Sequence, residues 1–159
     1  MILFCEDCGK KNLLNSIQFI TGKPSFRCSS CGYLNPYHFK PQENSILKKA
    51  DFFFEEAETF PEILGSFLFH REIGVLKNHM PEILNITDLD FLGKNLVQTY
   101  EACQSALGDV SEMVLAVADK NMIVKRMGKT LFIILACKTL ALPPGISEKL
   151  SRPDDQGGS

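Results

Sequence analysis

Apolar residues recur at helical spacing in two segments of the chain. The first segment has apolar residues at three- and four-residue steps: Ile46, Leu47, Ala50, Phe53, Phe54, Ala57 and Phe60. This spacing predicts a helix that packs one face into a core and ends at Pro61. The second segment has the stripe Leu89, Leu92, Leu96, Tyr100, Cys103 and Leu107. Thr87 or Asp88 offers an N-cap and Gly108 an end, so the longest helix of the chain is expected here.

Shorter apolar runs separated by turn residues predict five strands. Gly65–Phe69 and Gly74–Lys77 form an expected hairpin around Arg71–Ile73, and a three-stranded meander follows over Glu112–Ala118, Met122–Met127 and Leu131–Lys138. The turns of the meander are expected at Asp119–Asn121 and at the glycine-first pair Gly128–Lys129. The last strand is apolar on both faces, which places it at the centre of a sheet covered on both sides by helices.

Prolines and glycines divide the chain into parts. We expect a first domain over residues 1–36, a linker over 37–44 that contains Pro41, and a second domain over 45–150. Pro143 and Pro144 interrupt the chain before a short helix at Ile146–Leu150, and residues 151–159 have the composition of a disordered tail.

The first domain contains two cysteine doublets, Cys5 with Cys8 and Cys28 with Cys31. Two residues inside each doublet let both sulfurs bind one ion, and the separation of the doublets is typical of a zinc ribbon. Gly9 and Gly32 follow the doublets, where a positive φ lets the chain turn around the metal. Four thiolates close a tetrahedral shell, so one structural Zn²⁺ is expected, although four thiolates would also accept iron.

Composition and charge narrow the function classes. The net charge of -2 and the pI near 5.9 argue against a protein whose main partner is bulk nucleic acid or an anionic membrane. No export signal opens the sequence, and the longest apolar run is too short to span a bilayer. Unpaired Cys103 and Cys137 fit a reducing compartment, so a cytoplasmic protein is expected.

The order of predicted elements after residue 45 resembles the roadblock, or dynein light chain, domain. The stretches that carry the resemblance are Ile63–Phe69 with Ile73–Leu76 in the first hairpin, and Met122–Gly128 with Leu131–Ile134 in the second. The sequence departs from that family in a longer first turn and in the double proline before the last helix. The resemblance implies an α+β fold in which an α/β/α sandwich surrounds a five-stranded antiparallel sheet. It also implies a homodimer that acts as a scaffold or regulator of a Ras-like small GTPase rather than as an enzyme.

The sequence gives a separate reason to expect a dimer. The strand 112–118 would lie at a sheet edge, yet Met113–Ala118 carries no charge or proline to prevent pairing with another strand. Pairing of two copies along this strand would make the sheet continuous. Small residues Gly93 and Ala102 would let two helices approach, or would equally pack on their own sheet. The residues expected at the interface are Gly93, Val97, Tyr100, Met113, Leu115 and Val117.

Alternative functions depend on the first domain. Its basic residues are Lys10, Lys11, Lys23 and Arg27, and its aromatics include Phe26 and Tyr33. The linker that follows adds Tyr37, Phe39 and Lys40. Interleaved basic and aromatic residues are typical of nucleic-acid binding, although thiolate charge nearly cancels the basic excess once zinc is bound. A further alternative is that the ribbon binds a protein and the second domain only dimerises it.

Gly128–Thr130 resembles the end of a phosphate loop but lacks the required upstream glycine, and no histidine has a catalytic spacing.

Overall fold

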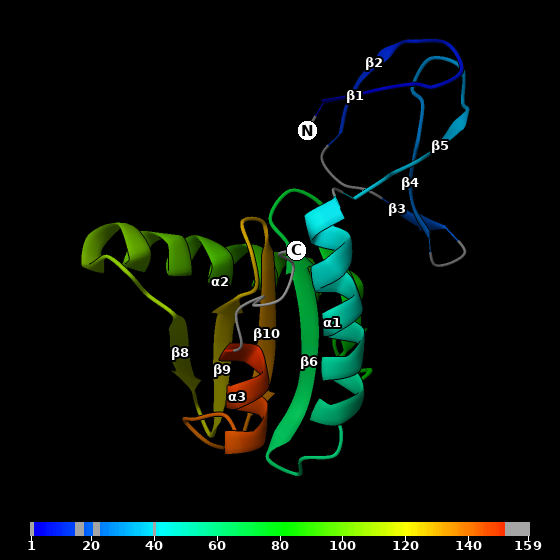
Figure 1. Ribbon diagram of the computed structural model, residues 1–159. Helices are drawn as coiled ribbons and strands as arrows, with labels where there is room; N and C mark the ends of the chain where they lie inside the picture. The colour runs from blue at the N-terminus through cyan, green and yellow to red at the C-terminus, as the bar shows by residue number, and fades with distance from the viewer. Residues whose placement is uncertain (1, 15–17, 21–22, 40, 152–159) are drawn as a thin grey trace, which may run out of the picture.

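The computed structural model describes residues 2–14, 18–20, 23–39 and 41–151. The larger part of the chain forms a layered domain, and strands β1 to β5 form a separate small module ahead of it (Figure 1). The elements of the larger domain are α1 (Pro41–Ala57), β6 (Ile63–His70), β7 (Gly74–His79), α2 (Ile86–Leu107), β8 (Glu112–Val117), β9 (Lys120–Arg126), β10 (Leu131–Cys137) and α3 (Pro144–Ser151).

The five strands form one antiparallel sheet in the order β7-β6-β10-β9-β8. Strand β10 is central and every one of its residues is buried, as its apolar character on both faces predicts. The register sets Ile134 of β10 opposite Phe67 of β6 on one side and opposite Val124 of β9 on the other. The predicted five-stranded sheet is therefore confirmed.

Helices cover both faces of the sheet, and the side chains of β10 divide between them. Leu131, Ile133, Leu135 and Cys137 pack in a core with Phe53 and Phe54 of α1 and Ile146 of α3. Phe132, Ile134 and Ala136 point to the other face and pack with Leu89, Leu96 and Val97 of α2. Since α1 and α3 lie on one side and α2 on the other, the domain is the predicted α/β/α sandwich (Figure 1).

The start of α2 differs from the sequence expectation. Asn85 is the N-cap, because its Oδ1 accepts a hydrogen bond from the backbone N–H of Asp88 at 2.9 Å. Thr87 and Asp88, expected as N-caps, lie inside the helix. Asn85 was not among the N-caps expected from the sequence, but an asparagine side chain accepts a first-turn N–H as well as a threonine or an aspartate does. The predicted end is confirmed, since the N–H of Gly108 donates to the carbonyl of Gln104 at 3.0 Å.

Two prolines begin helices rather than break them. Helix α1 starts at Pro41, inside the segment expected to be a linker, and α3 starts at Pro144. Proline lacks the N–H that the first turn of a helix leaves unpaired, so it fits there without loss. The carbonyl of Pro143 accepts from the N–H of Ile146 at 2.9 Å and forms the first turn of α3. Of the expected tail, Ser151 ends α3 and residues 152–159 lie outside the described residues.

Candidate functional site

The small module consists of a two-stranded and a three-stranded sheet, each antiparallel. The first pairs β1 (Ile2–Phe4) with β2 (Lys11–Leu13), and the second orders β3 (Gln18–Ile20), β4 (Lys23–Arg27) and β5 (Leu34–Pro36). One cysteine doublet lies in the β1–β2 turn and the other in the β4–β5 turn. Each doublet therefore lies in the tight reversal of a hairpin, the shape of a zinc knuckle.

The two knuckles have the same backbone geometry. In the first, the N–H of Gly9 donates to the carbonyl of Cys5 at 3.0 Å, and in the second Gly32 donates to Cys28 at 3.0 Å. The φ angles of Gly9 and Gly32 are +69° and +75°, the left-handed region that glycine enters without steric cost. This confirms the conformational reason for a glycine after each doublet.

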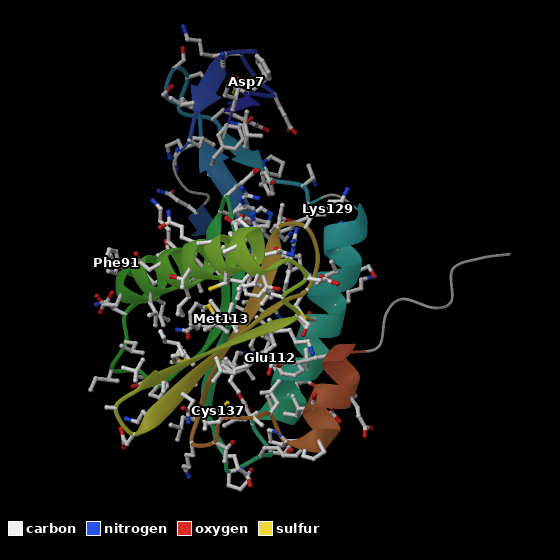
Figure 2. The ribbon with its side chains drawn as sticks, turned by 90° about the vertical axis from the view of Figure 1, so that its left-hand side faces the viewer. Asp7, Phe91, Glu112, Met113, Lys129 and Cys137 are labelled. Atoms are coloured by element: carbon white, nitrogen blue, oxygen red, sulfur yellow. The ribbon has the colours of Figure 1, made fainter. Side chains whose placement is uncertain are left out.

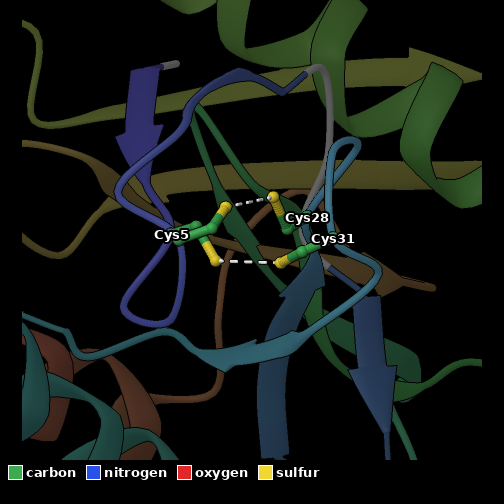
Figure 3. A group of neighbouring side chains, drawn as sticks. Cys5, Cys28 and Cys31 are labelled. Carbon is green, nitrogen blue, oxygen red and sulfur yellow. Dashed lines mark hydrogen bonds between the residues drawn. The ribbon is translucent and has the colours of Figure 1, made fainter.

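The four sulfurs lie within 4.8 Å of one another. The Sγ atoms of Cys5 and Cys31 are 3.6 Å apart, and those of Cys8 and Cys28 are 3.7 Å apart (Figure 3). Two sulfurs bound to one tetrahedral Zn²⁺ at about 2.3 Å are roughly 3.8 Å apart, so these spacings fit one shared metal ion. All four cysteines are free thiols. The cluster therefore fits a small zinc ribbon whose four ligands would close the metal shell.

The cysteines differ in burial and in acidity. Cys5 and Cys28, the first of each doublet, are buried, whereas Cys8 and Cys31 are exposed. The pKa of Cys28 is lowered to about 6, first by a hydrogen bond from the Cys31 N–H and then by those from the Ser30 N–H and the Asn12 amide. Together these outweigh desolvation, which raises it. The Tyr33 N–H lowers the pKa of Cys31, but desolvation and the three neighbouring thiols raise it to about 12. Four thiolates this close together repel one another, so the thiols cannot all ionise without a cation between them. A bound divalent metal ion would supply that positive charge.

Two asparagines complete the centre and were not recognised from the sequence. Asn12 and Asn35 are buried, and the Nδ2 of each lies within hydrogen-bonding distance of a cysteine sulfur. The signal was present in the chain as an exact internal repeat, Cys-x-x-Cys-Gly-x-x-Asn, at Cys5–Asn12 and Cys28–Asn35. Both asparagines therefore occupy equivalent places after the two knuckles.

The module contacts the larger domain through a small apolar cluster. Phe26 of β4 and Ile73 of the β6–β7 turn are both buried there, with Phe39 and Leu76 packed around them. The rings of Phe39 and Tyr37 meet edge to face with centroids 5.2 Å apart. Of the four aromatics considered for stacking on nucleic acid, only Tyr33 is exposed. The structure therefore uses the other three to join the two parts of the chain.

The residues expected at a dimer interface fall into two groups. Gly93, Val97 and Tyr100 are buried within the larger domain, where the Tyr100 hydroxyl donates to the carbonyl of Val110. Met113 is half-buried against the same core, whereas Leu115 and Val117 are exposed. The structure thus assigns the α2 residues to their own sheet, the alternative weighed for Gly93, and leaves β8 as the uncovered element.

Strand β8 is an apolar edge strand with little cover. It pairs only with β9 in the described sheet, and Val114, Leu115 and Val117 are 38, 41 and 52% exposed. Helix α2 runs above β8 in Figure 2, with Phe91 near its N-terminal end and 72% exposed. Beyond Phe91, the outward positions of α2 include the small or uncharged residues Asn95, Gln98 and Ala102. The exposed apolar residues of β8 together with Phe91, Asn95, Gln98 and Ala102 of α2 are here called the β8 edge surface.

Comparison with known proteins identifies the fold. No family model and no curated protein matches the sequence. Among solved structures, the Roadblock/LC7 domain from Streptomyces avermitilis superposes with a TM-score of 0.51 at 14% identity, covering 64% of this chain and 88% of that chain. The gliding protein MglB from Thermus thermophilus superposes with a TM-score of 0.50 at 20% identity, covering 72% and 91%. Myxococcus xanthus MglB gives 0.52 at 10% identity, covering 72% and 85%.

These similarities define an α+β protein of the roadblock fold. The expected resemblance is confirmed for the fold, which the antiparallel sheet and its covering helices share with the matched structures. This chain carries, in addition, an N-terminal four-cysteine cluster that fits a zinc ribbon. Among the described residues, no helix is long and apolar enough to cross a membrane.

Proposed function

We propose that this protein is a non-enzymatic homodimeric scaffold or regulator that binds a Ras-like small GTPase through its roadblock-fold domain. The uncovered β8 edge is the observation that carries the first step of this proposal. Its backbone groups face outward beside apolar side chains that are 38 to 52% exposed. A strand of this kind is stabilised by pairing with another strand, and a second copy of the chain supplies one by two-fold symmetry.

The dimer joins two sheets through β8, and α2 of each copy lies next to the junction. Phe91 and the small residue Ala102 lie on the outward side of α2, where they would contact the partner copy. Gly93, Val97 and Tyr100 support this surface from beneath by fixing α2 on its own sheet. The proposed interface is therefore carried by Leu115 and Val117 with the outer side of α2, and Met113 lies at its inner margin.

The ribbon adds a second interaction module that is held in shape by one structural Zn²⁺. Phe26 and Ile73 fix it to the β6–β7 turn, so a homodimer would carry two ribbons on one platform. The four thiolate ligands require a reducing environment, which supports a cytoplasmic location. Lys10 and Lys11 are exposed on the ribbon and would be available to an acidic partner.

Any effect on GTP hydrolysis would be exerted through the GTPase's own residues. Arg71 pairs with Glu101 at 3.3 Å, which engages its guanidinium within this chain. Arg126 donates to the carbonyl of Gly128 at 2.7 Å and to Oε1 of Gln104 at 3.1 Å. An arginine that inserts into a GTPase active site must be free to reach the γ-phosphate. These contacts support an allosteric or scaffolding role.

The test is binding to the Ras-like GTPases encoded by the same organism. Each GTPase would be loaded with GDP or with a non-hydrolysable GTP analogue, and complex formation measured by calorimetry. Phosphate release would then be followed with the wild-type protein and with Arg71→Ala and Arg126→Ala. Loss of an inserted arginine lowers the rate by roughly 10³–10⁵, so variants that retain the wild-type effect support the allosteric role. Absence of binding in both nucleotide states contradicts the proposal.

A further inference from the structure

Asn12 links the two knuckles from the first side. Its Nδ2 donates to the Sγ of Cys28 at 3.6 Å and to the carbonyl of Lys10 at 2.9 Å. Its Oδ1 accepts from the backbone N–H of Ser29 at 2.8 Å and from the Ser29 hydroxyl at 3.0 Å. One amide of the first knuckle therefore binds both a ligand sulfur and the neighbouring backbone of the second knuckle.

Asn35 makes the same sulfur and backbone contacts in the opposite direction, without a counterpart of the Ser29 hydroxyl. Its Nδ2 donates to the Sγ of Cys5 at 3.5 Å and to the carbonyl of Tyr33 at 3.1 Å. Its Oδ1 accepts from the backbone N–H of Glu6 at 2.7 Å. The two asparagines thus form a reciprocal pair, each reaching from the strand after its own doublet to the first cysteine of the other.

The burial of this pair indicates a specific role. Asn12 is 2% exposed and Asn35 is fully buried, and buried amides are costly unless their polar atoms are hydrogen-bonded. Both bond to Cys5 or Cys28, the two buried cysteines, and neither bonds to the exposed Cys8 or Cys31. A buried thiolate has little access to water, so a side-chain N–H directed at its sulfur replaces the lost hydration.

We propose that Asn12 and Asn35 are positioning residues of the metal centre, which hold the two knuckles together and donate to the buried ligand sulfurs. Four thiolates around a divalent zinc ion leave an excess negative charge, which hydrogen-bond donors offset. The cross-links also keep the two doublets at the separation that one tetrahedral ion requires. The consequence is tighter metal binding and slower metal release than the four cysteines would give alone.

The test uses the full chain loaded with one equivalent of Zn²⁺ and measures zinc transfer to a chromophoric chelator. Loss of an outer-shell partner typically costs about 10- to 100-fold in metal affinity, so Asn12→Ala and Asn35→Ala should each weaken binding by about this factor. The matched control is Asn78→Ala, which removes an exposed asparagine of β7 whose Oδ1 accepts from the backbone N–H of Met80 at 2.8 Å. This control should bind zinc as the wild type does.

Asn12→Asp and Asn35→Asp separate the sulfur contact from the backbone contact. An aspartate keeps the oxygen that accepts from Ser29 or Glu6 but loses the N–H that points to sulfur. We expect these variants to lose zinc affinity at least as strongly as the alanine variants. In Co²⁺-substituted protein, the sulfur-to-metal charge-transfer band should also shift, because a thiolate without its N–H donor is a stronger electron donor. Wild-type zinc affinity in the alanine variants, or wild-type affinity and an unshifted band in the aspartate variants, would overturn the proposal.

Discussion

Gly93 of α2 lies so close to Phe69 of β6 that a Cβ on Gly93 would be 2.4 Å from the Cδ2 of the Phe69 ring. Phe69 is buried in the core between α2 and the sheet. The absence of a side chain at position 93 therefore sets how closely α2 approaches its own sheet. This contact explains why a small residue in α2, which equally suggested a helix–helix interface, belongs to the core of the protomer.

We expect Gly93→Ala to destabilise the larger domain by about 1–3 kcal/mol, because a methyl group must displace the Phe69 ring in a packed core. The gain in helix propensity from alanine, about 1 kcal/mol, offsets only part of this cost. Urea unfolding followed by circular dichroism measures the difference. The exposed neighbour Lys94→Ala is the control and should change stability by less than about 0.5 kcal/mol. Equal stability of Gly93→Ala and the wild type would show that the ring has room to move.

The β8 edge surface predicts the oligomeric state. We expect the wild type to be a dimer in solution and Leu115→Glu to weaken the dimer by at least tenfold, since burying an unpaired charge costs more than about 1.4 kcal/mol. Sedimentation equilibrium over a range of concentrations gives both dissociation constants. Leu13→Glu is the control, because Leu13 is 78% exposed but lies on β2 of the ribbon, in a different sheet from β8. A monomeric wild type at high concentration would rule out the proposed interface.

Removal of the metal should affect both parts of the chain, to different degrees. Structural zinc contributes about 10–16 kcal/mol of apparent binding energy to small modules, so chelation should unfold the ribbon. The sheet domain should stay folded but lose about 1–2 kcal/mol, because Ile73 loses the cover of Phe26 and is exposed to water. Thermal unfolding with and without chelator, with metal content measured in parallel, tests both effects.

The Ile73→Ala variant identifies the contact responsible for that coupling. If Phe26 and Ile73 transmit the effect, chelation should lower the stability of the sheet domain less in Ile73→Ala than in the wild type. An equal loss in both proteins would place the coupling elsewhere. Simultaneous unfolding of the whole chain on chelation would show that the two parts do not fold independently.

The buried thiol of Cys137 predicts a loss of stability at alkaline pH. Burial and the nearby Glu112 carboxylate raise the pKa of Cys137 from 9.0 to about 11. The neutral thiol is favoured in the folded state, so its contribution is complete below pH 9 and is lost as the pH rises toward 11. At about 1.4 kcal/mol for each pKa unit, the loss over the two units is on the order of 3 kcal/mol. Cys137→Ala lacks this titration, so the difference between the two proteins in urea unfolding from pH 8 to 11 isolates it. A difference that does not change with pH would contradict the assignment.

The sequence by itself determined the sheet domain and the four cysteines that would bind a metal ion. The fully apolar run of β10 is stable only between two covering layers. Two Cys-x-x-Cys doublets at this separation are typical of a zinc ribbon and of few other sites. Both features follow from local pattern, because the apolar run of β10 and the spacing inside each doublet are formed by residues that are close neighbours along the chain. The repeated asparagines were also visible in the sequence, but their role depends on two long-range contacts. Asn12 bonds to Cys28, 16 positions away, and Asn35 bonds to Cys5, 30 positions away.

The tertiary structure alone decided where the ambiguous residues lie. Gly93, Val97 and Tyr100 became core residues because α2 docks on its own sheet, while Leu115 and Val117 stayed uncovered because β8 is the last strand of the sheet. By its sequence alone, Phe26 could equally stack on a ligand, but in the structure it is buried in one cluster with Ile73. Sequence pattern shows which side chains are apolar, but long-range packing decides whether the same chain, a partner or water covers them.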